Sequence, residues 1–152
     1  MKTIKLLALG LAASALMFTA CKKDEKTTET TSKSTLLTGK DWRMVGLTLT
    51  SPSGTVDIYA TMDACDKDDL QEFLAAGTVV SKPGATKCDP AEPDSSPGGN
   101  WALLNNESQL RVIDGDTTLM DISELTATSL KLKITEVDAG ITYYTNLTMT
   151  KN

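Results

Sequence analysis

The chain of 152 residues contains no histidine. Histidine is the usual base in Ser-His-Asp and Cys-His catalysis, a frequent zinc ligand and the side chain that titrates near neutral pH. Sites that depend on histidine are therefore excluded. Catalysis by two opposed carboxylates remains, but it needs a cleft, and the acidic residues fall mostly in expected loops. The sequence favours a protein that is not an enzyme and uses no cofactor.

Long apolar runs are also scarce. One uncharged run extends from Leu6 to Ala20, after two lysines and directly before Cys21. It is shorter than the ~20 residues that a membrane-spanning helix needs. A basic start, an apolar middle and small residues at the end form the pattern of a secretory signal. We therefore expect residues 1–20 to be a signal peptide.

The end of this run, Phe18-Thr19-Ala20-Cys21, resembles a bacterial lipobox. The resemblance implies cleavage before Cys21, a diacylglycerol on its thiol and acylation of the new amino terminus. The alternative is an ordinary signal peptide cut beside an unrelated cysteine, although a free thiol there is unusual for a secreted protein. The charged residues 22–25 resemble the segment that routes lipoproteins of the Bacteroidetes to the cell surface, or they are a solvated tether. We expect a lipid-anchored protein of the outer membrane.

Positive charge is in the minority. Without residues 1–20 the chain keeps 13 basic and 20 acidic residues, a net charge of −7. Nucleic acid is not an expected partner, because its binding relies on basic surfaces. Residues 21–35 contain almost only charged and hydroxyl-bearing side chains, none of which anchors a core, so we expect a flexible tether there. The remaining length, residues 36–152, fits a single domain.

From Trp42 onward, short segments rich in threonine and valine alternate with turn residues, which is typical of an all-β domain. The clearest pattern predicts a hairpin of residues 129–135 and 141–149 around the turn Asp138-Ala139-Gly140. Further strands are expected over residues 43–50, 56–61, 69–75, 78–81, 101–104, 109–113 and 117–123. In the hairpin, the side chains expected to point inward together are those of Leu130, Leu132, Ile134, Tyr143, Leu147 and Met149.

Residues 68–76 are the most ambiguous segment, because an amphipathic helix ended by Gly77 is the alternative to a strand there. About eight antiparallel strands close most economically into an up-and-down barrel, since closure leaves no exposed sheet edge. The predicted fold class is therefore all-β, with a single antiparallel up-and-down β-barrel.

Several elements support a family resemblance when they are taken with their spacing. They are Leu37-Thr38-Gly39-Lys40-Asp41-Trp42, Cys65 with its acidic run, Gly77 after Phe73, Thr86-Lys87-Cys88-Asp89-Pro90 and Gly99-Asn100-Trp101. Together they resemble the lipocalin-like domain of small lipoproteins of the Bacteroidetes, over about residues 36–151. The resemblance implies a lipocalin-like barrel. It implies no activity, because members of this family generally lack an assigned one.

Cysteine is scarce, with three in the chain. If Cys21 carries lipid, Cys65 and Cys88 remain, and export to an oxidising compartment favours their pairing. We expect this disulfide to hold the Pro-rich excursion, residues 82–99, against the strand region near Cys65. A nucleophilic thiol is the alternative, and it is disfavoured because no histidine is present to lower the thiol pKa.

Four aspartates surround Cys65, namely Asp63, Asp66, Asp68 and Asp69. Their oxygens are ligands that calcium accepts. The EF-hand spacing is absent, so a solvated acidic loop is the preferred interpretation and no metal site is predicted. The segment Asp114-Gly115-Asp116 is interpreted as a turn.

Aromatic residues make up only 5% of the chain. Trp42, Trp101 and Tyr143, with Leu132 and Leu147, are the candidate ligand-binding residues, because they would line a pocket in the barrel mouth. The interior of a small barrel is often filled by side chains, so core packing is the favoured alternative for the aromatic residues.

Two functions follow from these expectations. The first is a membrane-anchored, non-catalytic lipocalin-like lipoprotein that binds a small apolar or amphiphilic ligand. The alternative is a cell-envelope interaction protein that acts on a protein or glycan through its surface and holds no internal ligand. An open interior of a few hundred Å³ would favour the first function, and a filled interior would favour the second.

Overall fold

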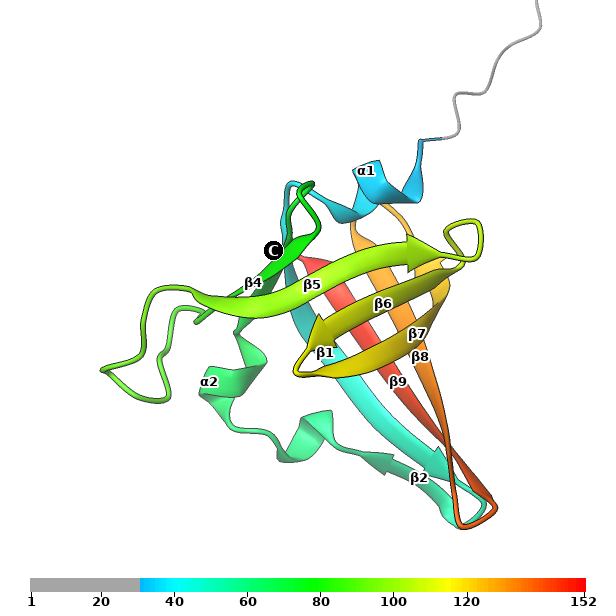
Figure 1. Cartoon of the computed structure of the whole chain (residues 1–152). Helices are drawn as coiled ribbons and strands as arrows, with labels where there is room; N and C mark the ends of the chain where they lie inside the picture. Colours follow the sequence, from blue (N-terminus) through cyan, green and yellow to red (C-terminus); the bar gives the residue numbers. More distant parts are fainter. Residues whose placement is uncertain (1–30) are drawn as a thin grey trace, which may run out of the picture.

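A computed structural model describes residues 31–152 of the chain (Figure 1). The predicted signal peptide, Cys21 and most of the predicted tether lie outside these described residues. The described part is nearly all β-structure. Its strands are β1 (Asp41–Ser51), β2 (Gly54–Asp57), β3 (Leu70–Phe73), β4 (Thr78–Lys82), β5 (Ser96–Leu104), β6 (Gln109–Asp114), β7 (Asp116–Leu125), β8 (Ser129–Asp138) and β9 (Ile141–Lys151). Its helices are α1 (Lys33–Leu37), the 3₁₀ turn η1 (Tyr59–Thr61) and α2 (Ala64–Lys67).

The strands form one antiparallel sheet in the order β2-β1-β3-β4-β5-β6-β7-β8-β9, and an additional pairing of β1 with β9 closes it. Eight strands make the barrel, and β2 is an extra strand paired with the far half of β1. The predicted all-β, up-and-down barrel is therefore confirmed. The expected hairpin of β8 and β9 is also confirmed, with Ala139 and Gly140 both at positive φ in its two-residue turn.

Two segments differ most from the sequence prediction at their ends. Strand β2 stops at Asp57, because the carboxylate of Asp57 accepts a hydrogen bond from the amide of Ala60 at 3.0 Å and stabilises the turn η1 instead. Strand β5 begins at Ser96, inside the segment that we expected to be an irregular excursion. There Gly99 has φ 88°, and any side chain at this position would collide with the backbone of Ile113 on β6.

The helical alternative for residues 68–76 is wrong, because Leu70–Phe73 form strand β3. This strand pairs with β1 on one side and with β4 on the other, so its backbone groups are satisfied by neighbours. The side chain of Phe73 is buried in the core. Tertiary pairing therefore decides a segment whose local pattern was ambiguous.

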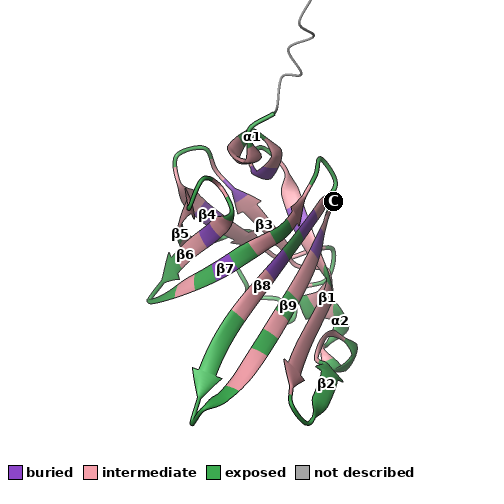
Figure 2. Cartoon of the chain, turned by 90° about the vertical axis from the view of Figure 1, so that its right-hand side faces the viewer, coloured by how far each residue is buried: buried purple, intermediate pink, exposed green. Residues whose placement is uncertain are grey.

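One end of the barrel is closed by α1 (Figure 2). Its first amide groups are capped by Ser32, whose hydroxyl accepts a hydrogen bond from the amide of Thr35 at 3.2 Å. Its last residue, Leu37, is fully buried. The first three residues of α1 fall within the predicted tether, so the folded part begins a few residues earlier than expected. The hydroxyl cap and the burial of Leu37 explain this difference.

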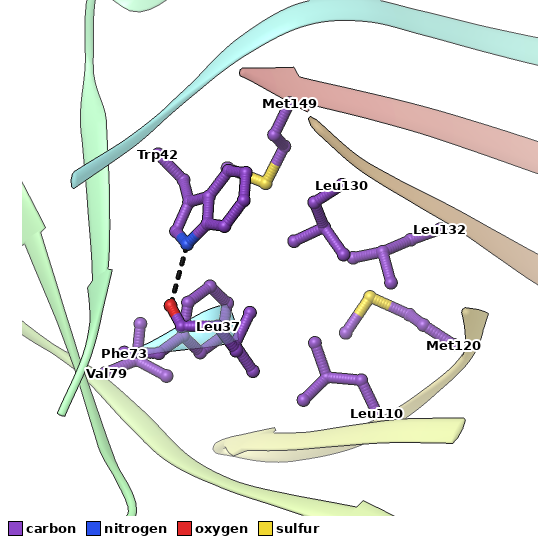
Figure 3. Packing of buried hydrophobic residues seen from close by; sticks show 9 residues of the cluster. All are labelled: Leu37, Trp42, Phe73, Val79, Leu110, Met120, Leu130, Leu132 and Met149. Atoms are coloured by element: carbon purple, nitrogen blue, oxygen red, sulfur yellow. Dashed lines mark hydrogen bonds between the residues drawn. The ribbon is translucent and has the colours of Figure 1, made fainter. Parts of the chain in front are cut away.

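The core lies next to this closed end (Figure 3). The register places Leu110 opposite Met120, and Leu130 opposite Met149, so paired strands deliver apolar side chains to the same interior. The nine buried apolar residues are Leu37, Trp42, Phe73, Val79, Leu110, Met120, Leu130, Leu132 and Met149. They fill the barrel at the end that α1 covers.

The opposite end is open and less buried. There the β1–β2 and β8–β9 hairpins extend beyond the tip of the β6–β7 hairpin (Figures 1 and 2). Strands β2, β1, β9 and β8 form a four-stranded extension whose inner face continues the face that carries the core.

Candidate functional site

The predicted ligand-binding residues divide into two groups. Trp42 is 0% exposed and Leu132 is 3% exposed, and both belong to the core cluster. Trp101 and Leu147 are partly buried and pack against that cluster. Tyr143 is half-buried and lies farther toward the open end, opposite Glu136 on β8. The structure therefore gathers four of the five residues at the core and leaves Tyr143 near the barrel mouth.

Both tryptophans are held by hydrogen bonds to the backbone. The indole nitrogen of Trp42 donates to the carbonyl of Leu37 at 2.8 Å, and that of Trp101 donates to the carbonyl of Leu74 at 2.9 Å. Trp101 also makes an edge-to-face contact with Phe73, with ring centroids 5.9 Å apart. The polar atoms of these rings are thus satisfied inside the protein, which supports the packing interpretation for both of them.

The sequence predicted only part of the surface near Tyr143, because it identified Ile134 and Tyr143 as inward-pointing residues but not their neighbours on β1 and β2. We define the mouth face as Leu49, Val56, Ile134, Tyr143 and Thr145. The register aligns Val56 with Leu49, Leu49 with Thr145, and Thr145 with Ile134, in one row across four strands. This row lies on the same face as Leu132 in the core, two residues before Ile134. The alternation of apolar residues in β1 is the signal that could have identified Leu49.

The mouth face is apolar and accessible. Val56 is 60% exposed, and the other four residues are half-buried. Ile141, at the tip of the β8–β9 hairpin, is another exposed apolar residue, with 42% of its surface accessible. Isolated exposed apolar side chains are common, but here they continue a buried core along one concave face. This arrangement could hold an apolar group in contact with the core.

A groove opens between β7 and β8 beside the mouth face. It has a volume of about 240 Å³ and is lined by Thr117, Thr118, Leu119, Ile134, Thr135 and Glu136. Ile134 belongs both to this groove and to the mouth face. The groove therefore borders the mouth face at Ile134.

Two further cavities flank the Pro-rich segment. One, of about 430 Å³, is open and lies against β4 and the start of β5, with hydroxyl and apolar side chains in its wall. The other, of about 270 Å³, contains the charged residues Asp69, Lys82 and Glu92. Burial raises the pKa of Asp69, and nearby Glu92, Asp66 and Asp68 raise it further, while a hydrogen bond from the backbone of Gly84 opposes this rise. Of the three cavities described here, the one of about 430 Å³ borders the core at Val79, and the other two are lined by residues outside the nine buried ones.

The expected disulfide between Cys65 and Cys88 is present, with Cα atoms 5.3 Å apart. Asp66 lies beside it. Because both sulfurs are joined, they offer no thiolate to a metal ion. The disulfide joins the Pro-rich segment to α2, so the predicted attachment near Cys65 is confirmed, but the element that carries Cys65 is a short helix and not the expected strand region.

The acidic loop around Cys65 also holds the Pro-rich segment. One carboxylate oxygen of Asp68 accepts a hydrogen bond from the amide of Thr86 at 2.9 Å. Gly84 lies so close to Asp68 that any side chain at position 84 would collide with its backbone. Asp68 therefore has a structural role in docking the segment, in addition to the solvated role that the sequence suggested for the acidic loop.

A comparison of the chain with protein-family models and with curated proteins finds no match. Among the described residues, no helix has the length and apolar character required to cross a membrane.

Proposed function

We propose that this protein is a non-catalytic lipoprotein, anchored by Cys21 to the outer membrane, that binds a small apolar or amphiphilic molecule at the open end of its barrel. The observation that carries this proposal is the mouth face, on which Val56 remains 60% exposed in line with the buried core. A ligand placed there would cover apolar surface that water now contacts, which stabilises the complex by about 25 cal/mol per Å² buried.

The filled core limits where the ligand can lie. Trp42, Leu110 and Leu130 are fully buried, so the closed end offers no room without rearrangement. We infer that an apolar group would rest on Leu49, Ile134 and Tyr143 and would keep any polar group toward solvent. Amphiphilic molecules with one short apolar part suit such a shallow site.

The barrel fold is compatible with the same proposal, because eight-stranded barrels such as those of lipocalins can hold one small ligand. The absence of histidine from the whole chain supports a binding role over catalysis. Acidic surface charge, with a net charge of −7 after residue 20, argues against anionic ligands with several negative charges.

The experiment that tests the proposal is titration of the purified protein with a fluorescent fatty acid. Tyr143→Ala should weaken binding about tenfold, since it removes most of one buried aromatic contact. The neighbouring Tyr144 offers a matched control, because it lies on the outer face of the same strand with Lys133 5.3 Å from its ring. Tyr144→Ala should leave the affinity unchanged, and equal losses in both variants would contradict the proposal.

A second candidate function is favoured by the packed core. A barrel filled by nine buried apolar residues needs no ligand for its stability. In this second case its outer surface would be the binding site. This protein would then contact a protein or glycan of the cell envelope. If the parent protein binds no apolar probe at saturating concentration, the ligand-binding proposal fails and this second function takes its place.

A further inference from the structure

The barrel wall is incomplete between β7 and β8. Their ladder runs from Leu125 and Leu130 to Asp121 and Lys133, and it stops there. Within residues 31–152, each strand beyond this point is paired on its other side only. Strand β7 pairs with β6 as far as Asp116, and β8 pairs with β9 as far as Asp138. The edges of β7 and β8 therefore diverge from the point where their ladder stops. We call the space between residues 116–120 of β7 and residues 134–138 of β8 the wedge.

The register shows which backbone groups face the wedge. The amide of Ile122 donates to the carbonyl of Ser108 at 2.9 Å, on the β6 side of β7. Because successive backbone groups alternate between the two edges of a strand, those of Thr117 and Leu119 point to the β8 side. By the same alternation, the backbone groups of Asp121 point toward β8, where Asp121 pairs with Lys133. The backbone groups of Lys133 therefore point toward β7, and so do those of Thr135 and Val137.

These backbone groups lie beside a groove of the right chemistry for an added strand. The groove between the two edges has a volume of about 240 Å³ and is lined by Leu119 and Ile134 together with Thr117, Thr118, Thr135 and Glu136. Leu119 is 46% exposed, although it lies in the middle of β7. Unpaired strand edges of this kind accept a further strand, and side-chain pockets beside them give specificity.

Carboxylates near the wedge determine which kind of partner segment it favours. Asp114 and Asp116 lie at the tip of the β6–β7 hairpin, and Glu136 and Asp138 lie on β8. Among residues 31–152, the ion pairs involve other carboxylates, namely Asp41, Glu72, Asp94 and Glu124. None of the four carboxylates near the wedge takes part in an ion pair of the described residues, and Glu136 lines the groove itself. A negative rim on a strand edge discourages acidic segments and favours basic ones.

We propose that the wedge is a docking site for an extended, basic segment of a partner protein, which adds as a strand between β7 and β8. Its backbone would pair with the free groups of Leu119 and Thr135, its apolar side chains would contact Ile134, and its lysines or arginines would lie near Asp116 and Glu136. The observations behind this inference are the strand edges and the charge, which differ from those behind the proposed ligand site, although the two sites share Ile134.

The test uses a fluorescent hexapeptide of alternating lysine and valine, with a hexapeptide of alternating glutamate and valine as the charge control. Fluorescence anisotropy should show saturable binding of the basic peptide and no binding of the acidic one. The affinity for the basic peptide should fall severalfold between about 0.05 M and 0.5 M salt, because salt screens the charges. Hydrogen exchange should slow at the amides of Leu119 and Thr135. Equal binding of the two peptides would overturn the proposal.

Two variants test the site itself. Thr135→Pro removes a wedge-facing amide that β9 does not use, and proline is tolerated on strand edges; it should lower affinity about tenfold. Glu136→Lys should lower affinity through charge without changing the backbone. Thr55→Pro, on the other free edge at β2, is the control and should have no effect. Unchanged binding in both wedge variants would refute the site.

The exchange experiment also identifies a competing occupant. If the amides of Leu119 and Thr135 exchange slowly in the full chain before any peptide is added, another segment of the chain already fills the wedge, and docking of a partner is overturned. Rapid exchange in the free protein, followed by protection on adding the basic peptide, is the result that the proposal expects.

Discussion

The indole nitrogen of Trp42 donates a hydrogen bond of 2.8 Å to the carbonyl of Leu37, the last residue of α1 (Figure 3). Both residues are fully buried. A helix of five residues has little stability of its own, so this bond and the burial of Leu37 fix α1 over the end of the barrel. The closed end therefore depends on one tryptophan.

Trp42→Phe should lower the free energy of unfolding by about 1–3 kcal/mol, because it leaves the buried carbonyl of Leu37 without its partner. Urea denaturation followed by circular dichroism measures this change. Trp101→Phe is a useful comparison, since its ring is only partly buried and its bond to Leu74 lies nearer the surface; we expect a smaller loss there. An equal or larger loss for Trp101→Phe would show that the closed end is not the critical element.

Much of the fold could be predicted because local signals agreed with one another. In β8 and β9, strict alternation and the turn at Ala139-Gly140 predicted the hairpin and its inward face, and Leu130, Leu132 and Met149 are indeed buried. The strand β3 was ambiguous because its pattern suits both a helix and a strand. Only pairing with β1 and β4 decides it, and pairing between distant segments leaves no local signature.

The candidate sites were harder to predict for the same reason. Aromatic residues suggested Trp42 as a ligand contact, but its place in the core follows from the closure by α1, five residues earlier. The mouth face joins Val56 on β2 with Ile134 on β8, which are far apart in the sequence. The wedge depends on where the β7–β8 ladder stops, next to a register shift between Ile122 and Glu124, and bulges of this kind are not evident from alternation.

The disulfide gives a second prediction. Replacing both Cys65 and Cys88 by serine should lower the free energy of unfolding by about 3 kcal/mol on the chain-entropy model, given a sequence separation of 23 residues. Limited trypsin digestion should then cut faster after Lys87, because the Pro-rich segment loses its covalent attachment. If the cleavage rate after Lys87 is unchanged, the hydrogen bond from Thr86 to Asp68 is sufficient to hold the segment.

The ion pairs of Lys82 predict that the free energy of unfolding depends on pH. Its ammonium group lies 2.6 Å from Glu72 and 2.9 Å from Asp41, and so connects β4 with β3 and β1. The hydrogen bonds to Glu72 and Asp41 raise the pKa of Lys82 above its usual 10.5. A raised lysine pKa means that the folded state holds the proton more tightly, so the stabilisation is complete below about pH 10.5 and is lost as the pH rises through the folded value.

Lys82→Gln should therefore reduce stability by about 1 kcal/mol at pH 7, and the difference from the parent should shrink above pH 10.5. Urea midpoints measured from pH 7 to 11.5 test this expectation. Lys131→Gln is the control, because the pair of Lys131 with Glu124 is more exposed, at 49% and 38% of their side chains. We expect no measurable change in that variant. A constant difference between Lys82→Gln and the parent across this pH range would contradict the assignment to the charged lysine.

The last prediction concerns attachment to the membrane. We expect Cys21→Ala to release the protein from washed outer membranes, because the proposed lipid on this thiol supplies the acyl chains on which stable anchoring depends. The described residues contain no helix that could replace the anchor. Serine replacement of Cys65 and Cys88 is the matched control, since it also removes thiol groups but leaves the lipobox-like segment intact, and it should keep the protein in the membrane fraction. Immunoblots of membrane and soluble fractions measure the partition. Retention of Cys21→Ala at the level of the parent would mean that protein contacts hold the chain at the membrane, and the lipid-anchor part of the proposed function would be abandoned.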